Sequence, residues 1–163
     1  MSDSARNDLR AIRLWLAVFI AGLVLSGLTA FPLEREAGGI VRGLAAAGVP
    51  ADSSLVIWMV RVRDALAEIG ERHPFLPYGT DWLAFAHLVI AVAFIGPWRD
   101  PVRNRWVIDW GLIACAMVIP LALIAGPLRG IPWWWRLVDC SFGVFGAIPL
   151  LIVRRRIDRL AAG

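Results

Sequence analysis

The chain contains no lysine, although 17 of its 163 residues are basic, and charged residues of both signs make up only 18% of it. Hydrophobic residues make up 59%. A soluble domain of this size needs more polar residues to cover its surface, so we predict an integral membrane protein. Every basic residue is an arginine, and the arginines are scattered between apolar segments. This pattern argues against a nucleic-acid interface and favours contact with the bilayer and its anionic lipid headgroups.

The sequence also lacks the common signatures of metal, nucleotide and redox chemistry. It has no CxxC, HExxH, GxGxxG or P-loop pattern. Its two cysteines, Cys115 and Cys140, lie in apolar segments, where a thiol usually packs as a small hydrophobic group. Of the two histidines, His73 falls in a polar connection, which excludes a haem held by two histidines within the membrane. We therefore predict no metal and no cofactor.

Apolar runs long enough to cross a bilayer occur four times in the sequence. A spanning helix needs about 20 mainly apolar residues. The first run follows a polar, arginine-bearing segment but lacks the small-residue cleavage site of a signal peptide, so we expect it to be retained. In this run Gly22, Ser26 and Ala30 recur every four residues, which predicts a face for close helix contact. The predicted spans are residues 13–31, 79–98, 106–126 and 133–153.

These spans predict an all-α fold, an integral membrane four-helix bundle formed by residues 1–163 as a single domain. The one long connection, residues 32–78, is predicted to lie outside the membrane. Glu34 to Gly48 predicts a short helix there, and Ser53 can cap a second helix that runs to Arg72. Apolar residues follow one stripe of this second helix, so we predict an amphipathic helix that lies in the headgroup plane or covers the bundle.

The distribution of arginine predicts the orientation of the chain in the membrane. More arginines flank the spans on the side that holds both termini than on the other side. Basic residues near span ends favour the cytoplasmic side. We therefore predict that both termini are cytoplasmic and that the connection 32–78 is exterior. Tight turning between the last two spans is expected at Gly130 to Pro132.

Two ionisable residues, His87 and Asp139, fall inside predicted spans and share their helix faces with small residues. His87 lies six residues below Asp81 and Asp139 lies six residues below Trp133, which places both at a depth of about 9 Å in a helix. We predict that they face each other, either as a structural link between two helices or as a working site such as a proton relay. The residues expected nearer the outer surface are Arg136, Arg129, Asp81 and Ser141.

A second charged group is predicted at the inner face. It comprises Arg99, Asp100, Arg103, Arg105 and Asp109. Arg105 and Asp109 are four residues apart and can pair on one helix face. The small-residue side of the third span points away from Asp109, which leaves open whether this carboxylate faces the bundle or reaches the membrane interface. We expect the group to anchor the chain to anionic headgroups.

Three segments within residues 78–146, YGTDWLAFAH, FIGPWRDPVRN and GPLRGIPWWWRLVDCSFGVFG, resemble a group of bacterial inner-membrane proteins that have four spans and no known activity. The resemblance covers a little under half of the chain. It implies a multi-pass protein of the bacterial inner membrane, and it implies no cofactor or catalytic residue. The chain lacks the paired aspartate motifs of lipoprotein signal peptidases and the CxxC of quinone-linked disulfide oxidases.

Three functions remain open from the sequence. The lack of a complete catalytic constellation favours a non-catalytic accessory or interaction subunit, with a larger membrane protein or a second copy of the chain as its partner. One alternative is a proton-coupled carrier centred on His87 and Asp139. The other is a membrane enzyme acting on a lipid or quinone, with His87 as base and Arg129 or Arg136 holding an anionic headgroup.

Overall fold

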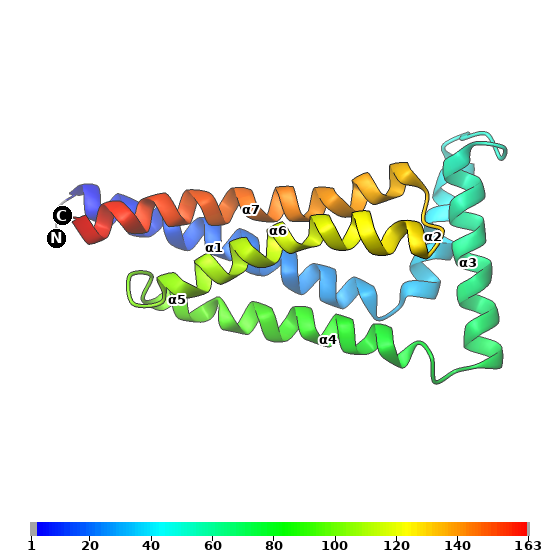
Figure 1. Ribbon diagram of the computed structural model, residues 1–163, viewed down its shortest axis with the longest axis horizontal. Coiled ribbons are helices and arrows are strands. Elements are labelled where there is room, and N and C mark those ends of the chain that lie inside the picture. The colour runs from blue at the N-terminus through cyan, green and yellow to red at the C-terminus, as the bar shows by residue number, and fades with distance from the viewer. Residues whose placement is uncertain (1–2, 163) are drawn as a thin grey trace. The chain divides into compact units, whose positions relative to one another are not determined.

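The computed structural model describes residues 3–162, and every regular element in that range is a helix (Figure 1). The all-α prediction is confirmed. The helices are α1 (Asp3–Ala30), α2 (Leu33–Ala46), α3 (Ser54–Arg72), α4 (Tyr78–Ala93), α5 (Ile95–Arg99), α6 (Arg105–Leu128) and α7 (Trp133–Ala162).

Four helical segments are long and apolar enough to cross a membrane, as predicted. They are α1, the stretch Tyr78–Arg99 that contains α4 and α5, α6, and α7. Two of them extend past the predicted spans, because α1 already begins at Asp3 and α7 continues to Ala162. These polar extensions are held by tertiary contacts: Ile12 and Ile157 are fully buried. Tertiary packing of one face supplies most of a helix's stability, so polar turns can extend a span.

The second candidate span is interrupted near its end, which the sequence reading did not predict. α4 and α5 are separated at Phe94. Pro97 lacks the N–H group that would donate to the carbonyl of Ala93 in a continuous helix. The side-chain amide of Asn104 donates to the carbonyl oxygen of Gly96 at 3.3 Å. This bond ties α5 to the turn that leads into α6.

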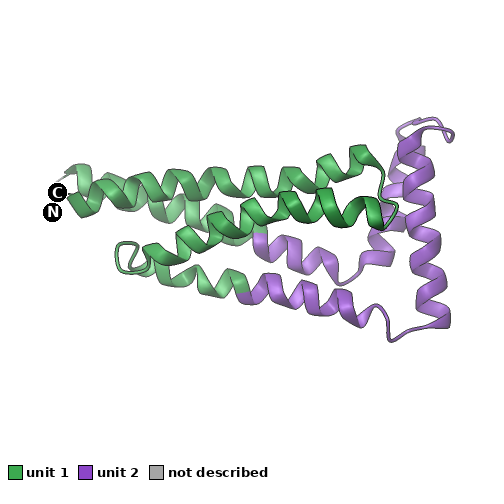
Figure 2. Ribbon diagram, viewed as in Figure 1, with its two compact units in different colours: residues 1–22, 90–163 green, residues 23–89 purple. Residues whose placement is uncertain are grey.

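The chain divides into two compact units (Figure 2). Unit 1 comprises residues 1–22 and 90–163, and unit 2 comprises residues 23–89. α1 and α4 each pass from one unit into the other.

In unit 1, α6 and α7 pack along each other as a hairpin joined by a tight turn (Figure 1). Gly130 has φ = 67°, a left-handed conformation that glycine adopts without strain. The N–H of Ile131 donates to the carbonyl of Gly126 at 3.0 Å, which closes the end of α6 in a Schellman motif. The predicted tight turn is confirmed.

Small residues allow α6 and α7 to approach closely. A Cβ added at Gly143 of α7 would collide with the carbonyl oxygen of Cys115 of α6, and one added at Gly111 of α6 would lie 2.9 Å from Cδ1 of Leu150 of α7. Phe142 and Phe145, on the opposite side of α7, are 68% and 67% exposed. This division into a small contact face and a bulky outer face is the one predicted for helices that meet each other on one side and lipid on the other.

In unit 2, α2 and α3 pack together and bury Ala37 and Met59. The hydroxyl oxygen of Ser53 accepts a hydrogen bond from the N–H of Val56 at 3.3 Å, which is the predicted cap. Gly48 ends α2 with φ = 72°. The two helices predicted in the long connection are therefore confirmed.

The last turns of α1 contact the first turns of α4 within unit 2. A Cβ added at Gly27 would lie 2.9 Å from the carbonyl oxygen of Ala84 and 3.2 Å from Cβ of His87. Ser26 is exposed, so α1 contacts α4 through Gly27, and the contact face predicted at Gly22, Ser26 and Ala30 stays a prediction. One residue turns a helix by about 100°, since there are 3.6 residues per turn, and this rotation places Gly27 rather than Ser26 at the contact.

Candidate functional site

The structure divides the six residues predicted for the intramembrane site between the two units. Four belong to unit 1 and two to unit 2: Arg129, Arg136, Asp139 and Ser141 in the first, Asp81 and His87 in the second. The direct pairing of His87 with Asp139 stays a prediction.

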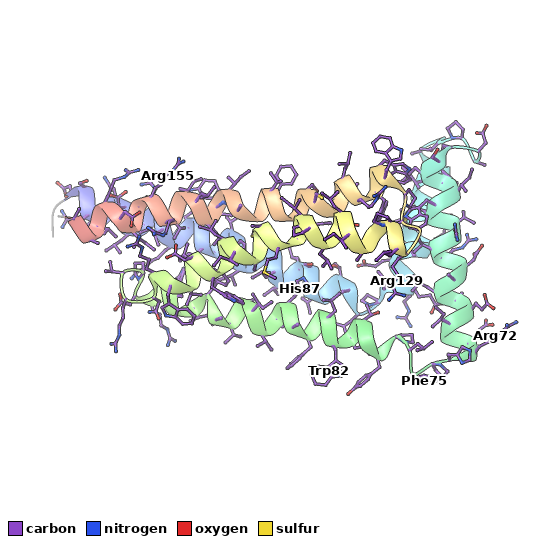
Figure 3. The ribbon with its side chains drawn as sticks, viewed as in Figure 1. Arg72, Phe75, Trp82, His87, Arg129 and Arg155 are labelled. Carbon is purple, nitrogen blue, oxygen red and sulfur yellow. The ribbon has the colours of Figure 1, made fainter. Side chains whose placement is uncertain are left out.

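A cavity of about 250 Å³ lies between α6 and α7 in unit 1. Asp139 of α7 and Arg129, which follows the last residue of α6 (Figure 3), are the charged residues that line it. The remaining lining is apolar and includes Val118, Leu121 and Ala122. This arrangement places a carboxylate against an apolar hollow within a candidate membrane span.

Arg136 lies on the same helix, three residues before Asp139, but its side chain runs toward α6. A Cβ added at Gly126 would lie 2.5 Å from Cδ of Arg136, so the absence of a side chain at Gly126 makes room for the arginine. Nε of Arg136 is buried and has no hydrogen-bond partner among residues 3–162. The aliphatic part of the Arg136 side chain is therefore packed against α6, while its buried Nε lacks a hydrogen-bond acceptor.

Asp139 also lacks a bonded partner in the part of the chain that the structure describes. The ion pairs and side-chain hydrogen bonds found there involve neither Asp139 nor Arg129 nor Arg136. Asp139 faces the cavity and Arg136 packs on Gly126, which explains why their spacing along α7 does not produce a pair. We call Arg129, Arg136 and Asp139 the unpaired cluster.

Ser141 is engaged within its own helix. Its hydroxyl group donates to the carbonyl oxygen of Val138 at 2.6 Å, a local bond that serine commonly makes inside helices. The structure therefore gives Ser141 a backbone partner rather than a place in the cavity.

His87 lies on the face of α4 that contacts α1 within unit 2, as its small neighbours predicted (Figure 3). Its Nδ1 is 2.8 Å from the carbonyl oxygen of Leu83. A carbonyl can only accept, so Nδ1 carries the proton that is donated in this bond, and in the neutral ring Nε2 remains an acceptor. Asp81, six residues before His87 on α4, lines a separate cavity in the same unit.

The inner-face group is only partly brought together. Two of its five predicted members, Arg105 and Asp109, join Arg154 and Asp158 of α7 in a network. Arg105 lies 3.2 Å from Asp158 and 4.0 Å from Asp109, and Arg154 donates to both carboxylates. Asp109 of α6 is thus bonded to α7, because the long side chain of Arg154 reaches it from that helix.

The other three predicted members lie in and beside the turn between α5 and α6. The carboxylate of Asp100 accepts a hydrogen bond from the N–H of Arg103 at 3.1 Å, which stabilises the turn. Arg99 and Arg103 are exposed. Their contact with anionic headgroups stays a prediction.

The sequence reading missed the partner of the most buried charge. Asp8 of α1 is 7% exposed and accepts a hydrogen bond from Arg156 of α7 at 2.7 Å. Arg159 lies 3.8 Å from the same carboxylate. The four-residue spacing of Arg154 and Asp158 could have indicated their own pair, whereas nothing in the polar N-terminal segment indicated that Asp8 meets α7.

Within residues 3–162 no group of three or more histidines, cysteines, aspartates and glutamates is placed to hold a metal ion. Comparison with protein-family models, with curated protein sequences and with solved structures finds no match. The case for a function therefore depends on the side chains of the candidate site.

Proposed function

We propose that this chain is a multi-pass protein of the bacterial inner membrane that acts as a non-catalytic interaction subunit of a membrane complex. Both termini lie in the cytoplasm, and α2 and α3 lie on the outer side of the membrane. One observation carries the proposal: Arg136 and Asp139 lie in a candidate span and have no bonded partner in the described chain.

Unpaired charges inside a membrane need a partner for energetic reasons. An aspartate or arginine at the centre of a spanning helix costs about 2.5–3.5 kcal/mol on insertion scales. Such residues almost always face protein and pair with another polar group. The partner we infer is a membrane protein whose spanning segment carries a hydrogen-bond donor for Asp139 and an acceptor for Arg136.

The position of the unpaired cluster fits docking of a partner helix. Arg136 fills the space beside Gly126, so the place for a partner helix is the hollow next to Asp139, which is lined mainly by apolar side chains, among them the small residues Ala122 and Ala125. Small residues at such places let two helices approach closely enough for their polar side chains to bond. The competing arrangement is the predicted pair of Asp139 with His87, in which the chain satisfies its own carboxylate.

Affinity purification at native expression level in a mild detergent tests the proposal. Mass spectrometry of the wild-type sample should show a stoichiometric membrane protein. The Asp139→Asn and Arg136→Met variants should lose it while reaching the same level in the membrane. Arg155→Gln is the matched control, because Arg155 lies on the same helix and is exposed.

Two results would contradict the proposal. The first is a wild-type chain that purifies without a stoichiometric partner, alone or as a homo-oligomer. The second is an equal loss of folded protein in His87→Ala and Asp139→Asn, which would make the two residues an internal structural link.

A second candidate function is supported by the cavity itself. A carboxylate that lines a hollow and is not held in an ion pair can bind and release a proton, as a proton-coupled carrier requires. Proteoliposomes with a pH-sensitive dye inside distinguish this function from the first. Proton flux that survives Asp139→Glu and disappears in Asp139→Asn would favour the carrier.

A further inference from the structure

A second cavity, of about 540 Å³, lies wholly within unit 2. It is formed where α1 ends, α2 begins, α3 passes and α4 starts. Its volume falls within the range of roughly 300–1,000 Å³ that is usual for ligand sites. Most of its lining is apolar and includes Phe31, Leu33, Leu66, Ile69 and Leu76.

Charges of both signs line this cavity without neutralising each other. They are carried by Glu34 and Arg35 in the first turn of α2 and by Asp81 in the first turn of α4. None of the three side chains makes an ion pair or a hydrogen bond within residues 3–162. Thr80 adds a hydroxyl group to the same lining.

The charged groups of the lining suit two different kinds of ligand group. Arg35 offers a forked set of N–H donors that suits a phosphate group. No side chain caps the first N–H groups of α2, and Pro32 to Arg35, where that helix begins, line the cavity. Asp81 and Glu34 are acceptors, and they suit a primary ammonium group that can donate hydrogen bonds to both.

We propose that this cavity binds a zwitterionic phospholipid with a primary ammonium group, of the phosphatidylethanolamine type. The phosphate lies at Arg35, the ammonium lies between Asp81 and Glu34, and the first part of an acyl chain lies along Leu66, Ile69 and Leu76. The ligand is a lipid because the cavity adjoins the ends of two candidate spans, α1 and the stretch that begins at Tyr78. This inference is independent of the partner proposed for the unpaired cluster.

The test is native mass spectrometry of the full chain after exchange into nanodiscs of defined lipid composition. Wild-type protein should retain one phosphatidylethanolamine per chain, about tenfold more strongly than phosphatidylcholine, whose quaternary ammonium cannot donate hydrogen bonds. Phosphatidylglycerol, which has no ammonium group, should be retained as weakly as phosphatidylcholine. Arg35→Gln and Asp81→Asn should each lower retention about tenfold.

Arg42→Gln is the matched control, because Arg42 also lies on α2 and is exposed but does not line the cavity. Its retention of phosphatidylethanolamine should equal that of the wild type. Size-exclusion chromatography confirms that each variant is folded before the lipid measurement. A variant that fails this check is replaced by Arg35→Met or Asp81→Ala, which remove the same charge and for which the same loss of preference for phosphatidylethanolamine is expected.

Three results would overturn the proposal. Equal retention of all three lipids would show only general contact with the bilayer. If Arg42→Gln lowered retention as much as Arg35→Gln does, the cavity would not be the site that binds the lipid. Competition by water-soluble phosphoethanolamine as effective as that by the intact lipid would show that the apolar lining is not used.

Discussion

The hairpin of α6 and α7 carries charged residues toward both of its ends, and the two groups differ in one respect. Toward the end of α7, arginines of that helix meet Asp109 of α6, Asp158 of α7 and Asp8 of α1 in ion pairs. Toward its beginning, the unpaired cluster has no such bonds in the described chain. We call the first group the paired cluster: Asp8, Arg105, Asp109, Arg154, Arg156, Asp158 and Arg159.

The comparison shows that residue type alone does not reveal what a charge in or beside a candidate membrane span does. Both clusters combine arginine with aspartate, and both include residues of α7. The paired cluster is explained by stability, because each carboxylate is bonded and holds two helices together. The unpaired cluster gains nothing comparable from its own unit, so its presence calls for a partner outside that unit.

The largest effect is expected from Asp8→Ala in the paired cluster. Removing this buried carboxylate leaves Arg156, whose side chain is 30% exposed, without its partner, and we expect a cost of about 2–3 kcal/mol, at or below the value for a fully buried pair. Chemical unfolding in detergent, followed by circular dichroism, measures the loss. Asp3→Ala is the control, because the Asp3 side chain is 88% exposed and its loss should barely change stability. Equal effects of the two variants would contradict a structural role for Asp8.

A smaller loss is expected from Gly143→Ala, which disturbs the helix contact on which both clusters depend. The added Cβ collides with a backbone carbonyl of α6, and overpacking of this kind costs about 1–3 kcal/mol. Gly22→Ala is the control, since nothing lies within 4 Å of a Cβ at that position. The same unfolding measurement should show no loss for Gly22→Ala. A neutral Gly143→Ala would mean that the two helices are less closely packed than described.

Arg154→Ala should cost about 1–2 kcal/mol, between the values for exposed and buried ion pairs. Arg154 is 22% exposed and bonds two carboxylates. Its neighbour Arg155 points away from the adjacent helices (Figure 3) and is exposed, so Arg155→Ala should leave the unfolding midpoint almost unchanged. A midpoint that falls equally for both variants would show that net charge, rather than the specific pairs, stabilises this end.

The sequence predicts those features that depend on neighbouring residues. The apolar runs, the serine cap of α3 and the glycine turn at Gly130 each arise from a few consecutive positions, and all are found in the structure. The small face of α7 and the bulky face opposite it follow from helical periodicity. Local sequence patterns were therefore sufficient to predict the helices and the face of α7 on which Asp139 lies.

Contacts between distant residues could not be predicted in this way. Asp8 and Arg156 are 148 positions apart, and only the packing of α1 on α7 brings them together. The cavity of unit 2 likewise forms where several segments meet, so Arg35 and Asp81 carry no shared sequence signal. The side on which Asp109 finds a partner could not be predicted either, because that partner, Arg154, lies on another helix.

The free energy of unfolding of Asp139→Asn, measured beside the wild type in the same detergent, tests the central claim most directly. The variant replaces a carboxylate that has no bonded partner in its unit, so we predict a stability within about 0.5 kcal/mol of the wild type, or higher, as removal of an uncompensated charge allows. A loss as large as that of Arg154→Ala would contradict the account, because it would show that Asp139 already holds the folded chain together.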